Sequence, residues 1–338
     1  MLVGGSRHAP MNLFVSLKYL VALDDHKHFG RAALASHVTQ PALSNALRAL
    51  EAHFSIAIVN RGRNFAGFTA EGERILVSAR QILREHELLQ QDLHSRSADP
   101  RGNLLIGAVP TAMPIAARFV AMLQDRHPGI VPTLRSMSSV ELETGLENLA
   151  LDMGLGYTER MDASRSLLRV VPQYTEYYFL LRRRVPQGPL TQPAPPGLTV
   201  PDSLQIGPAI DWVEAAKLPL CLLSPEMHNR RIVDRAFEQA GVQVTAAIET
   251  NSIWPLVLSV QAGRVGSIMP GGLVSAMPGY PELEALPLMN PQVAVPIAFM
   301  VHETNRPSRT LEAALALAQD DEWLQQAARY SGLLAGKP

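Results

Sequence analysis

The stretch HVTQPALSNALRALEAHF, His37–Phe54, decides how the first part of this chain folds. Its apolar residues are three or four positions apart, as on the buried face of an amphipathic helix, at Leu43, Leu47, Leu50 and Phe54. Thr39 suits the N-cap, and Pro41 suits the first turn, where a missing N–H does no harm. The opposite face carries compact hydrogen-bonding groups in place of a Lys/Glu ladder, namely Gln40, Ser44, Asn45 and Arg48. That composition needs a functional explanation.

The residues around this stretch complete a small helical domain with a hairpin. Apolar spacing predicts one helix over residues 12–25 and a second, short helix over residues 29–36. Only His37 and Val38 separate the second helix from the third, so the connection is a tight turn. Residues 55–69 read as two short β-prone pieces around a basic tip at Arg61–Asn64. This arrangement predicts a winged helix-turn-helix, in which the second helix of the pair enters the major groove of DNA.

The basic charge of the chain is concentrated at this end. The formal net charge of the whole chain is -1, whereas residues 26–66 carry five Lys or Arg side chains and one acid, Glu51. Gln and Asn can pair with adenine edges, Ser adapts to either partner, Pro can lie against a thymine methyl group, and Arg mostly contacts phosphates. The predicted DNA-contacting residues are Arg31, Thr39, Gln40, Pro41, Ser44, Asn45, Arg48, Arg61 and Arg63. The alternative is that these side chains form ordinary solvated faces.

A long helix is expected to follow from Thr69, which suits its N-cap. Positions spaced 4-3-4-3-4 resemble the seam of a coiled coil, and they are Ile75, Ala79, Ile82, His86, Leu89 and Leu93. The seam implies a partner helix, but the spacing gives neither the orientation nor the number of strands. His86 is either a pH-sensitive contact or a tolerated edge position. Residues 97–102, SADPRG, break the helix and serve as a hinge.

Beyond the hinge, β-prone and helical stretches alternate, which predicts a parallel or mixed α/β sheet system in two lobes. The Pro-rich residues 187–207 are expected to be a surface excursion. With 338 residues, 47% of them hydrophobic and 18% charged, the chain is expected to hold two or three globular units.

Targeting and redox features are sparse. No uncharged apolar run of 18 residues and no secretory signal are visible, so we expect no membrane span and a cytoplasmic location. The count of one cysteine excludes an internal disulfide and agrees with a reducing compartment. That cysteine, Cys221, lies in the apolar stretch PLCLLS and is expected to be a buried, inert thiol.

Three segments of the chain, LKYLVAL, FGRAALASHVTQPALSNALRALE and FTAEGERIL, resemble the N-terminal domain of LysR-type transcriptional regulators. The resemblance implies a fold of α+β and α/β type. Its parts are a winged helix-turn-helix over 11–68, a linker and dimerisation helix over 69–97, and a periplasmic-binding-protein-like effector domain over 101–335. Lobe I is expected at about 101–173 and 279–335, and lobe II at about 174–278. Asn45 and Asn60 depart from the common pattern, which affects which bases are read more than whether DNA is bound.

Ligands in such folds lie where strands end and helices begin. The residues expected there are Thr111, Ala112, Ser138, Ser139, Tyr157, Ser224, Thr250 and Asn251. Thr111 and Ser139 match positions whose hydroxyls bind an effector carboxylate in relatives, although either could be a simple N-cap. Tyr157 stands where several aromatic-acid sensors use Arg, which disfavours a dicarboxylate and favours a small mono-anion or a neutral compound.

A narrower resemblance concerns the second half of the effector domain. The runs LSPEMHNRRIVDRAFEQAG and IETNSI are similar to the cyanate-operon-regulator branch, which implies a small inorganic or one-carbon anion. Asn229 and Arg230 could help to hold such an ion, whereas the position of Arg230 and Arg231 near the start of an exposed helix favours solvated surface.

The expected function is therefore sequence-specific transcriptional regulation by a protein that is not an enzyme and that responds to a small, anionic effector. The expected partners are double-stranded promoter DNA and further copies in a homodimer and homotetramer, with contact to RNA polymerase left open; no cofactor, metal or membrane is expected. The alternatives are an α/β enzyme or a solute-binding module with an accessory helical domain. The sequence lacks a P-loop, GxGxxG after a strand, GxSxG and HExxH, and a solute-binding protein would need export.

Overall fold

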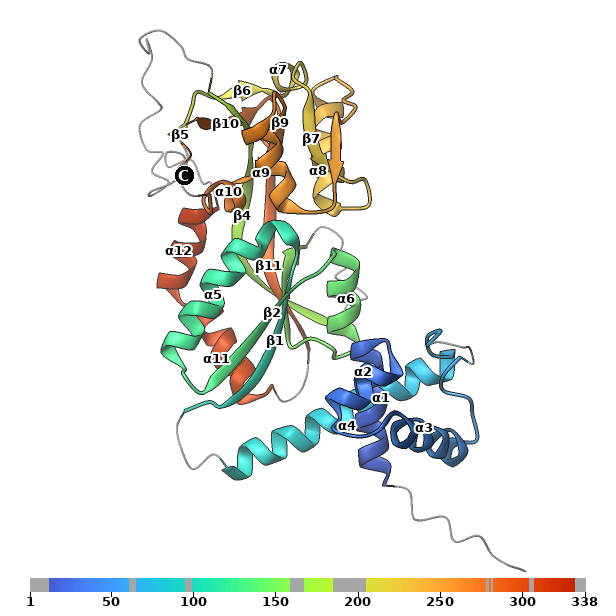
Figure 1. Cartoon of the computed structure of the whole chain (residues 1–338). Helices are drawn as coiled ribbons and strands as arrows, with labels where there is room; N and C mark the ends of the chain where they lie inside the picture. Colours follow the sequence, from blue (N-terminus) through green and yellow to red (C-terminus); the bar gives the residue numbers. More distant parts are fainter. Residues whose placement is uncertain are drawn as a thin grey trace, which may run out of the picture. The chain divides into compact units, whose positions relative to one another are not determined.

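The computed structural model describes residues 12–60, 65–94, 99–158, 167–184, 205–277, 280, 282–303 and 307–331 (Figure 1). The chain divides into two compact units, one formed by the residues up to Ala98 and one by nearly all the residues from Asp99 onward. Among the described residues, no helix is both long enough and apolar enough to cross a membrane.

The N-terminal unit contains four helices, which are α1 (Leu13–His26), α2 (Phe29–Ala35), α3 (Gln40–Phe54) and α4 (Ala70–His94). Its core is formed mainly by leucines, of which Leu43, Leu47 and Leu50 come from α3. The expected buried face of α3 is thus confirmed for three residues, but Phe54 is 40% exposed. Phe54 is the last residue of the helix and is followed by Ser55 in the left-handed conformation, so the chain turns away before the ring is covered.

The base of the hairpin after α3 is held by side chains. Val59 and Phe68 form an antiparallel bridge, and the Asn60 amide donates to the Phe68 carbonyl at 2.9 Å. The Glu51 carboxylate accepts from the backbone N–H groups of Ile58 and Val59 at 2.8 and 3.1 Å. The single acid in this basic region therefore has a structural role. The hairpin tip expected at residues 61–64 lies outside the described residues.

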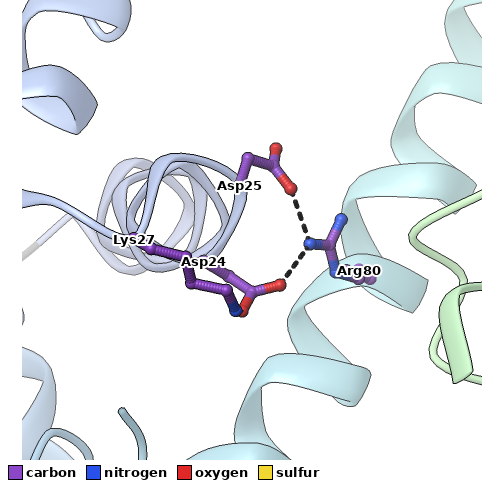
Figure 2. Close-up of polar contacts among 4 residues, drawn as sticks. All are labelled: Asp24, Asp25, Lys27 and Arg80. Atoms are coloured by element: carbon purple, nitrogen blue, oxygen red, sulfur yellow. Dashed lines mark hydrogen bonds and ion pairs between the residues drawn. The ribbon is translucent and has the colours of Figure 1, made fainter. Parts of the chain in front are cut away.

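An ion-pair cluster joins α1 to α4 (Figure 2). One guanidinium nitrogen of Arg80, whose side chain is only 8% exposed, lies 2.7 Å from both an Asp24 and an Asp25 oxygen. Lys27 pairs with Asp24 from the solvent side. Burial lowers the pKa of Arg80, but hydrogen bonds and charge from Asp25 and Asp24 outweigh it and raise the pKa above its ordinary value.

The C-terminal unit is built on a mixed sheet in which one long strand, β4 (Leu168–Arg183), runs through two lobes (Figure 1). The first lobe adds strands in the order β2-β1-β3-β11 to β4, and they are β1 (Gly102–Ala108), β2 (Ile130–Ser136), β3 (Met153–Tyr157) and β11 (Ala294–His302). Its helices are η1 (Pro110–Ala112), α5 (Met113–Arg126), α6 (Ser139–Glu147), α11 (Arg309–Ala318) and α12 (Asp321–Tyr330). In Figure 1, α5 and α11 cover one face of these strands and α6 covers the other.

The second lobe adds strands in the order β9-β7-β8 to the far end of β4. These strands are β7 (Leu220–Leu223), β8 (Ile248–Thr250) and β9 (Gly266–Pro270), and a further ladder holds β5 (Gln205–Ile206), β6 (Ile210–Asp211) and β10 (Leu283–Met289). The helices are α7 (Trp212–Ala215), α8 (His228–Gln239), α9 (Ile253–Ala262) and α10 (Gly271–Val274). Cys221 in β7 is fully buried, as expected, and burial raises the pKa of its thiol.

The boundary expected between the lobes is wrong at one crossing. We expected the chain to return to lobe I at about residue 279, but β10 pairs antiparallel with Phe179–Arg183, the second-lobe end of β4. The return occurs after β10, through β11, which pairs with both β3 and the first part of β4. An apolar strand fits either lobe by pattern, so only its pairing partner settles where residues 283–289 belong. Of the Pro-rich excursion, the described residues Gln205 and Ile206 pair with β10 as β5.

Candidate DNA interface and candidate effector site

The residues predicted to contact DNA share one surface of the N-terminal unit. Thr39 caps α3 by accepting from the Ala42 N–H at 3.4 Å, which confirms the predicted cap. Gln40, Pro41, Asn45 and Arg48 are exposed, and Ser44 is half-buried. The buried leucines fix which side of the helix these residues occupy, so the polar face predicted from the sequence points outward.

Two details refine this interface. Arg48 donates to the Asn45 amide oxygen at 3.1 Å, so the two side chains form one polar unit. Arg31 on α2 is exposed, as phosphate contact requires. Arg61 and Arg63 lie outside the described residues.

The seam expected along α4 is only partly available for a partner. Ile82 and Leu89 are 48% and 55% exposed, and Ile75 is half-buried. Ala79 is fully buried in the core of its own unit, and His86 contacts the Phe14 ring with a centroid distance of 4.5 Å. The seam therefore includes two positions that already pack inside the chain, because the heptad pattern also describes how α4 contacts α1. The side chain of Leu93 lies outside the described residues.

A groove of about 610 Å³ lies beside this face of α4. Apolar side chains from α1, α4, the end of α3 and the segment after it line the groove, among them Leu13, Leu17, Phe54, Ile56, Ile75 and Ile82. The exposed ring of Phe54 is thus part of a larger apolar surface.

Two of the predicted effector residues meet in the C-terminal unit, where the lobes join. The Thr111 hydroxyl on η1 lies 2.7 Å from the Tyr157 hydroxyl at the end of β3. The Asn229 amide on α8 donates to the hydroxyls of Tyr157 at 3.2 Å and Tyr178 at 2.9 Å. All four side chains are buried, so a polar network links both lobes to β4.

The other predicted effector residues differ in what their side chains do. Ser138 forms a reciprocal cap with Glu141 at the start of α6, with its N–H and hydroxyl each 2.8 Å from the carboxylate. Among the described residues, the buried Ser139 hydroxyl has no hydrogen-bond partner. The Thr250 hydroxyl is used locally, because it accepts from the Ser252 N–H at 3.1 Å.

The last three predicted effector residues differ in their exposure to solvent. Ala112 is fully buried, Ser224 is half-buried at the end of β7, and Asn251 is exposed. Asn251 and Ser136 border a mainly apolar pocket of about 420 Å³ whose wall also includes Pro110, Met113, Trp254, Leu273 and Met277.

Arg230 is neither an available anion ligand nor a solvated side chain, which corrects both readings of its position. It is 7% exposed, and its guanidinium donates to the Asp234 and Glu249 carboxylates at 2.8 and 3.0 Å and to the Leu223 carbonyl at 2.7 Å. The carboxylates come from α8 and β8, which the sequence places apart. Arg230 therefore joins these elements inside the second lobe.

Glu176 is a buried acid beside the polar network, and the sequence analysis did not single it out. It lies on β4 and is 0% exposed, and neither carboxyl oxygen has a hydrogen-bond partner among the residues that the structure describes. Burial raises its pKa to about 8; the Tyr157 hydroxyl acts in the opposite direction, although no bond of normal geometry joins the two. Burial and the Glu176 charge also raise the pKa values of Tyr157 and Tyr174. The available signal was a lone acid in the apolar, aromatic run YTEYYFLL.

The described residues hold no group of three or more His, Cys, Asp or Glu side chains that could bind a metal ion.

Comparison with known protein families covers most of the chain. Residues 14–73 match the model of the bacterial regulatory helix-turn-helix protein of the lysR family, and residues 97–322 match the LysR substrate binding domain. The chain belongs to the LysR family. The narrower resemblance to cyanate-operon regulators remains a prediction.

Curated relatives in the LysR family align with part of the chain. The hydrogen peroxide-inducible genes activator of Haemophilus influenzae is 34% identical over 140 residues, which are 41% of this chain and 46% of that protein. The DNA-binding transcriptional dual regulator OxyR of Escherichia coli is 34% identical over 137 residues, or 40% and 45% of the two chains. The match thus spans about half the length of these relatives, which are transcriptional regulators and not enzymes.

Solved structures of the LysR family share the fold along the chain. A full-length OxyR variant from Pseudomonas aeruginosa has a TM-score of 0.67 at 21% identity, covering 96% of this chain and 100% of that chain. CbnR in complex with its target DNA has a TM-score of 0.61 at 20% identity, covering 93% and 99%. At these identities the likeness establishes the fold alone, with a helix-turn-helix followed by a two-lobed α/β effector domain.

Proposed function

We propose that this LysR-family protein is a cytoplasmic transcriptional regulator that binds promoter DNA through α3 and responds to a small molecule held between the two lobes. The main support for this proposal is the exposed polar face of α3, which the buried leucines and the Thr39 cap hold in a fixed orientation. A helix-turn-helix presents such a face to the edges of bases in the major groove.

The effector would act by favouring one arrangement of the lobes over another. The network from Thr111 through Tyr157 to Asn229 supports this mechanism, because it connects both lobes through buried hydrogen bonds that a ligand could replace. The anionic character expected from the sequence remains a prediction.

Assembly into dimers, and of dimers into a homotetramer that can contact RNA polymerase, belongs to the same proposal. The exposed Ile82 and Leu89 and the apolar groove along α4 support pairing of two copies.

Footprinting of the upstream region of the gene and its neighbours tests DNA binding. We expect a protected site bound with a dissociation constant of about 10⁻⁸ M or tighter, weakening steeply with salt. Gln40→Ala and Ser44→Ala should each cost about 1–3 kcal/mol on the best site and relax sequence preference there. Arg31→Ala should weaken binding to all sequences alike and reduce the salt slope by about 1.

Arg135→Ala provides a matched control, because Arg135 is exposed on β2 of the C-terminal unit. It should leave affinity and salt slope unchanged. If Gln40→Ala and Arg31→Ala lose affinity equally on every sequence, base reading has been assigned to the wrong residues; if no site is protected on any neighbouring promoter, the proposal fails.

A further inference from the structure

We propose that Glu176 binds the ammonium group of a small apolar amine, so that the effector is an organic cation. This inference rests on the proposed function in that it names the ligand class of the same inter-lobe site. It differs from the small anion expected from the sequence.

The first reason is the carboxyl group itself. Burial of a charge is costly unless the charge is paired, and in the described part of the chain both Glu176 oxygens are buried without a hydrogen-bond partner. Within the described part of the chain, no hydrogen bond or ion pair joins Glu176 to a lysine, arginine or histidine. An anion placed here would find no cationic side chain beside the carboxyl group, whereas an ammonium group would stabilise the ionised form of Glu176 and supply the missing donors.

The second reason is the aromatic surroundings. Tyr157 and Tyr174 are close enough to Glu176 for its charge to affect their ionisation. The Tyr174 hydroxyl is buried and finds no hydrogen-bond partner among the described residues. Tyrosine rings attract cations through their π faces, and their hydroxyl oxygens accept hydrogen bonds. An ammonium group has three N–H donors, and the Glu176 oxygens and the Tyr174 hydroxyl provide three acceptors.

The third reason is the apolar pocket nearby. A side chain added at Gly272 on α10 would place its Cβ 3.5 Å from the Glu176 Oε1 and 3.7 Å from the Thr111 carbonyl oxygen. The next residue, Leu273, and the residue before Thr111, Pro110, both line the 420 Å³ pocket. The segments η1 and α10 thus lie between the Glu176 carboxyl group and an apolar pocket, and that pocket can hold the hydrocarbon part of an amine.

Proton linkage gives the proposal a second signature. The Glu176 carboxyl is largely protonated below its pKa of about 8, and an ammonium group binds its ionised form. Gly272 on α10 and Val295 on β11 lie beside Glu176, and the Thr111 carbonyl lies beside Gly272; none of these groups carries a charge. Tyr157 and Tyr174 stay neutral because their pKa values are raised. The His228 ring on α8 packs against the Tyr157 ring with a centroid distance of 4.7 Å.

Calorimetry on the full chain tests the proposal with methylammonium, n-butylammonium and phenethylammonium as probes, and with n-butanol and butyrate as neutral and anionic analogues. At least one ammonium probe should bind, and neither analogue should. The affinity should rise by about tenfold per pH unit between about pH 6 and pH 8 and then level off.

Three variants localise the binding. Glu176→Gln keeps the shape of the side chain and should weaken binding by at least about 100-fold with no remaining pH dependence. Gly272→Ala fits without a clash and should weaken binding by at least about tenfold at unchanged or higher thermal stability, because its methyl group occupies the space beside Oε1. Glu303→Gln, at an exposed acid, is the control and should bind as the original chain does.

The proposal is overturned if none of the three ammonium probes binds, if butyrate binds with the affinity of n-butylammonium, or if folded Glu176→Gln retains full affinity. Footprinting of the same preparations separates this result from the broader function. A chain that protects DNA but binds no ammonium probe overturns the inference alone. A chain that binds an ammonium probe through Glu176 but protects no DNA supports the inference and overturns the proposed role in transcription.

Discussion

At the scale of single residues, the sheet places the Glu176 carboxyl group in the protein interior, where ionisation is unfavourable. Its pKa is raised from an ordinary 4.5 to about 8, so the folded protein binds more protons at this group than the unfolded chain between those values. The stability that this group contributes is therefore fully present below pH 4.5 and is lost as the pH rises through 8.

Glu176→Gln should remove this dependence. We expect little change in the free energy of unfolding near pH 5 and a gain on the order of 2–4 kcal/mol near pH 9, since each pKa unit corresponds to about 1.4 kcal/mol. Urea unfolding of the C-terminal unit, followed in the full chain at both pH values, measures the difference. A gain of equal size at both would show that Glu176 is not the titrating group, and Glu303→Gln should give no gain at either.

At the scale of elements, the contact of α1 with α4 depends on a buried cation facing two acids. Arg80→Met should leave Asp24 and Asp25 without their partner and destabilise the N-terminal unit by about 2 kcal/mol, less than for a fully buried pair because the aspartates are partly exposed. Thermal unfolding followed by circular dichroism measures the loss.

The triple change Asp24→Asn, Asp25→Asn and Arg80→Met should recover most of that stability, because it removes the uncompensated charges together. Lys27→Met is the exposed control and should cost less than about 0.5 kcal/mol. If the triple variant is as unstable as Arg80→Met, the arginine acts by packing and not by charge.

At the scale of the whole molecule, the assembly of copies is expected to depend on apolar side chains that the monomer leaves exposed. Replacing Ile82 and Leu89 together by Ala should shift sedimentation from dimer or tetramer to monomer and weaken operator binding. Val140→Ala, at an equally exposed apolar residue on α6, should leave the sedimentation coefficient unchanged. Association of the double variant like that of the original chain would place the interface elsewhere.

The sequence by itself determined the parts of the fold that depend on near neighbours. The helix at Gln40–Phe54, its cap at Thr39 and the outward face with Gln40 and Asn45 follow from spacings of three and four residues, and the structure confirms them. Such spacing fixes a helix and its buried side because each contact lies within about one turn of the next. The reciprocal cap of Ser138 with Glu141 is local in the same way.

Only the tertiary structure decided features that join distant segments. Tyr157 lies within hydrogen-bond distance of Thr111 and Asn229, and Glu176 is fully buried. The strand β10 pairs with the second-lobe end of β4. Nothing in the local sequence pattern of these residues requires these contacts. An apolar strand satisfies the same pattern in either lobe, and an acid in a strand can face solvent as easily as the interior. The physical reason is that burial and pairing depend on which elements the folded chain brings against a residue, and that choice is made over the whole domain.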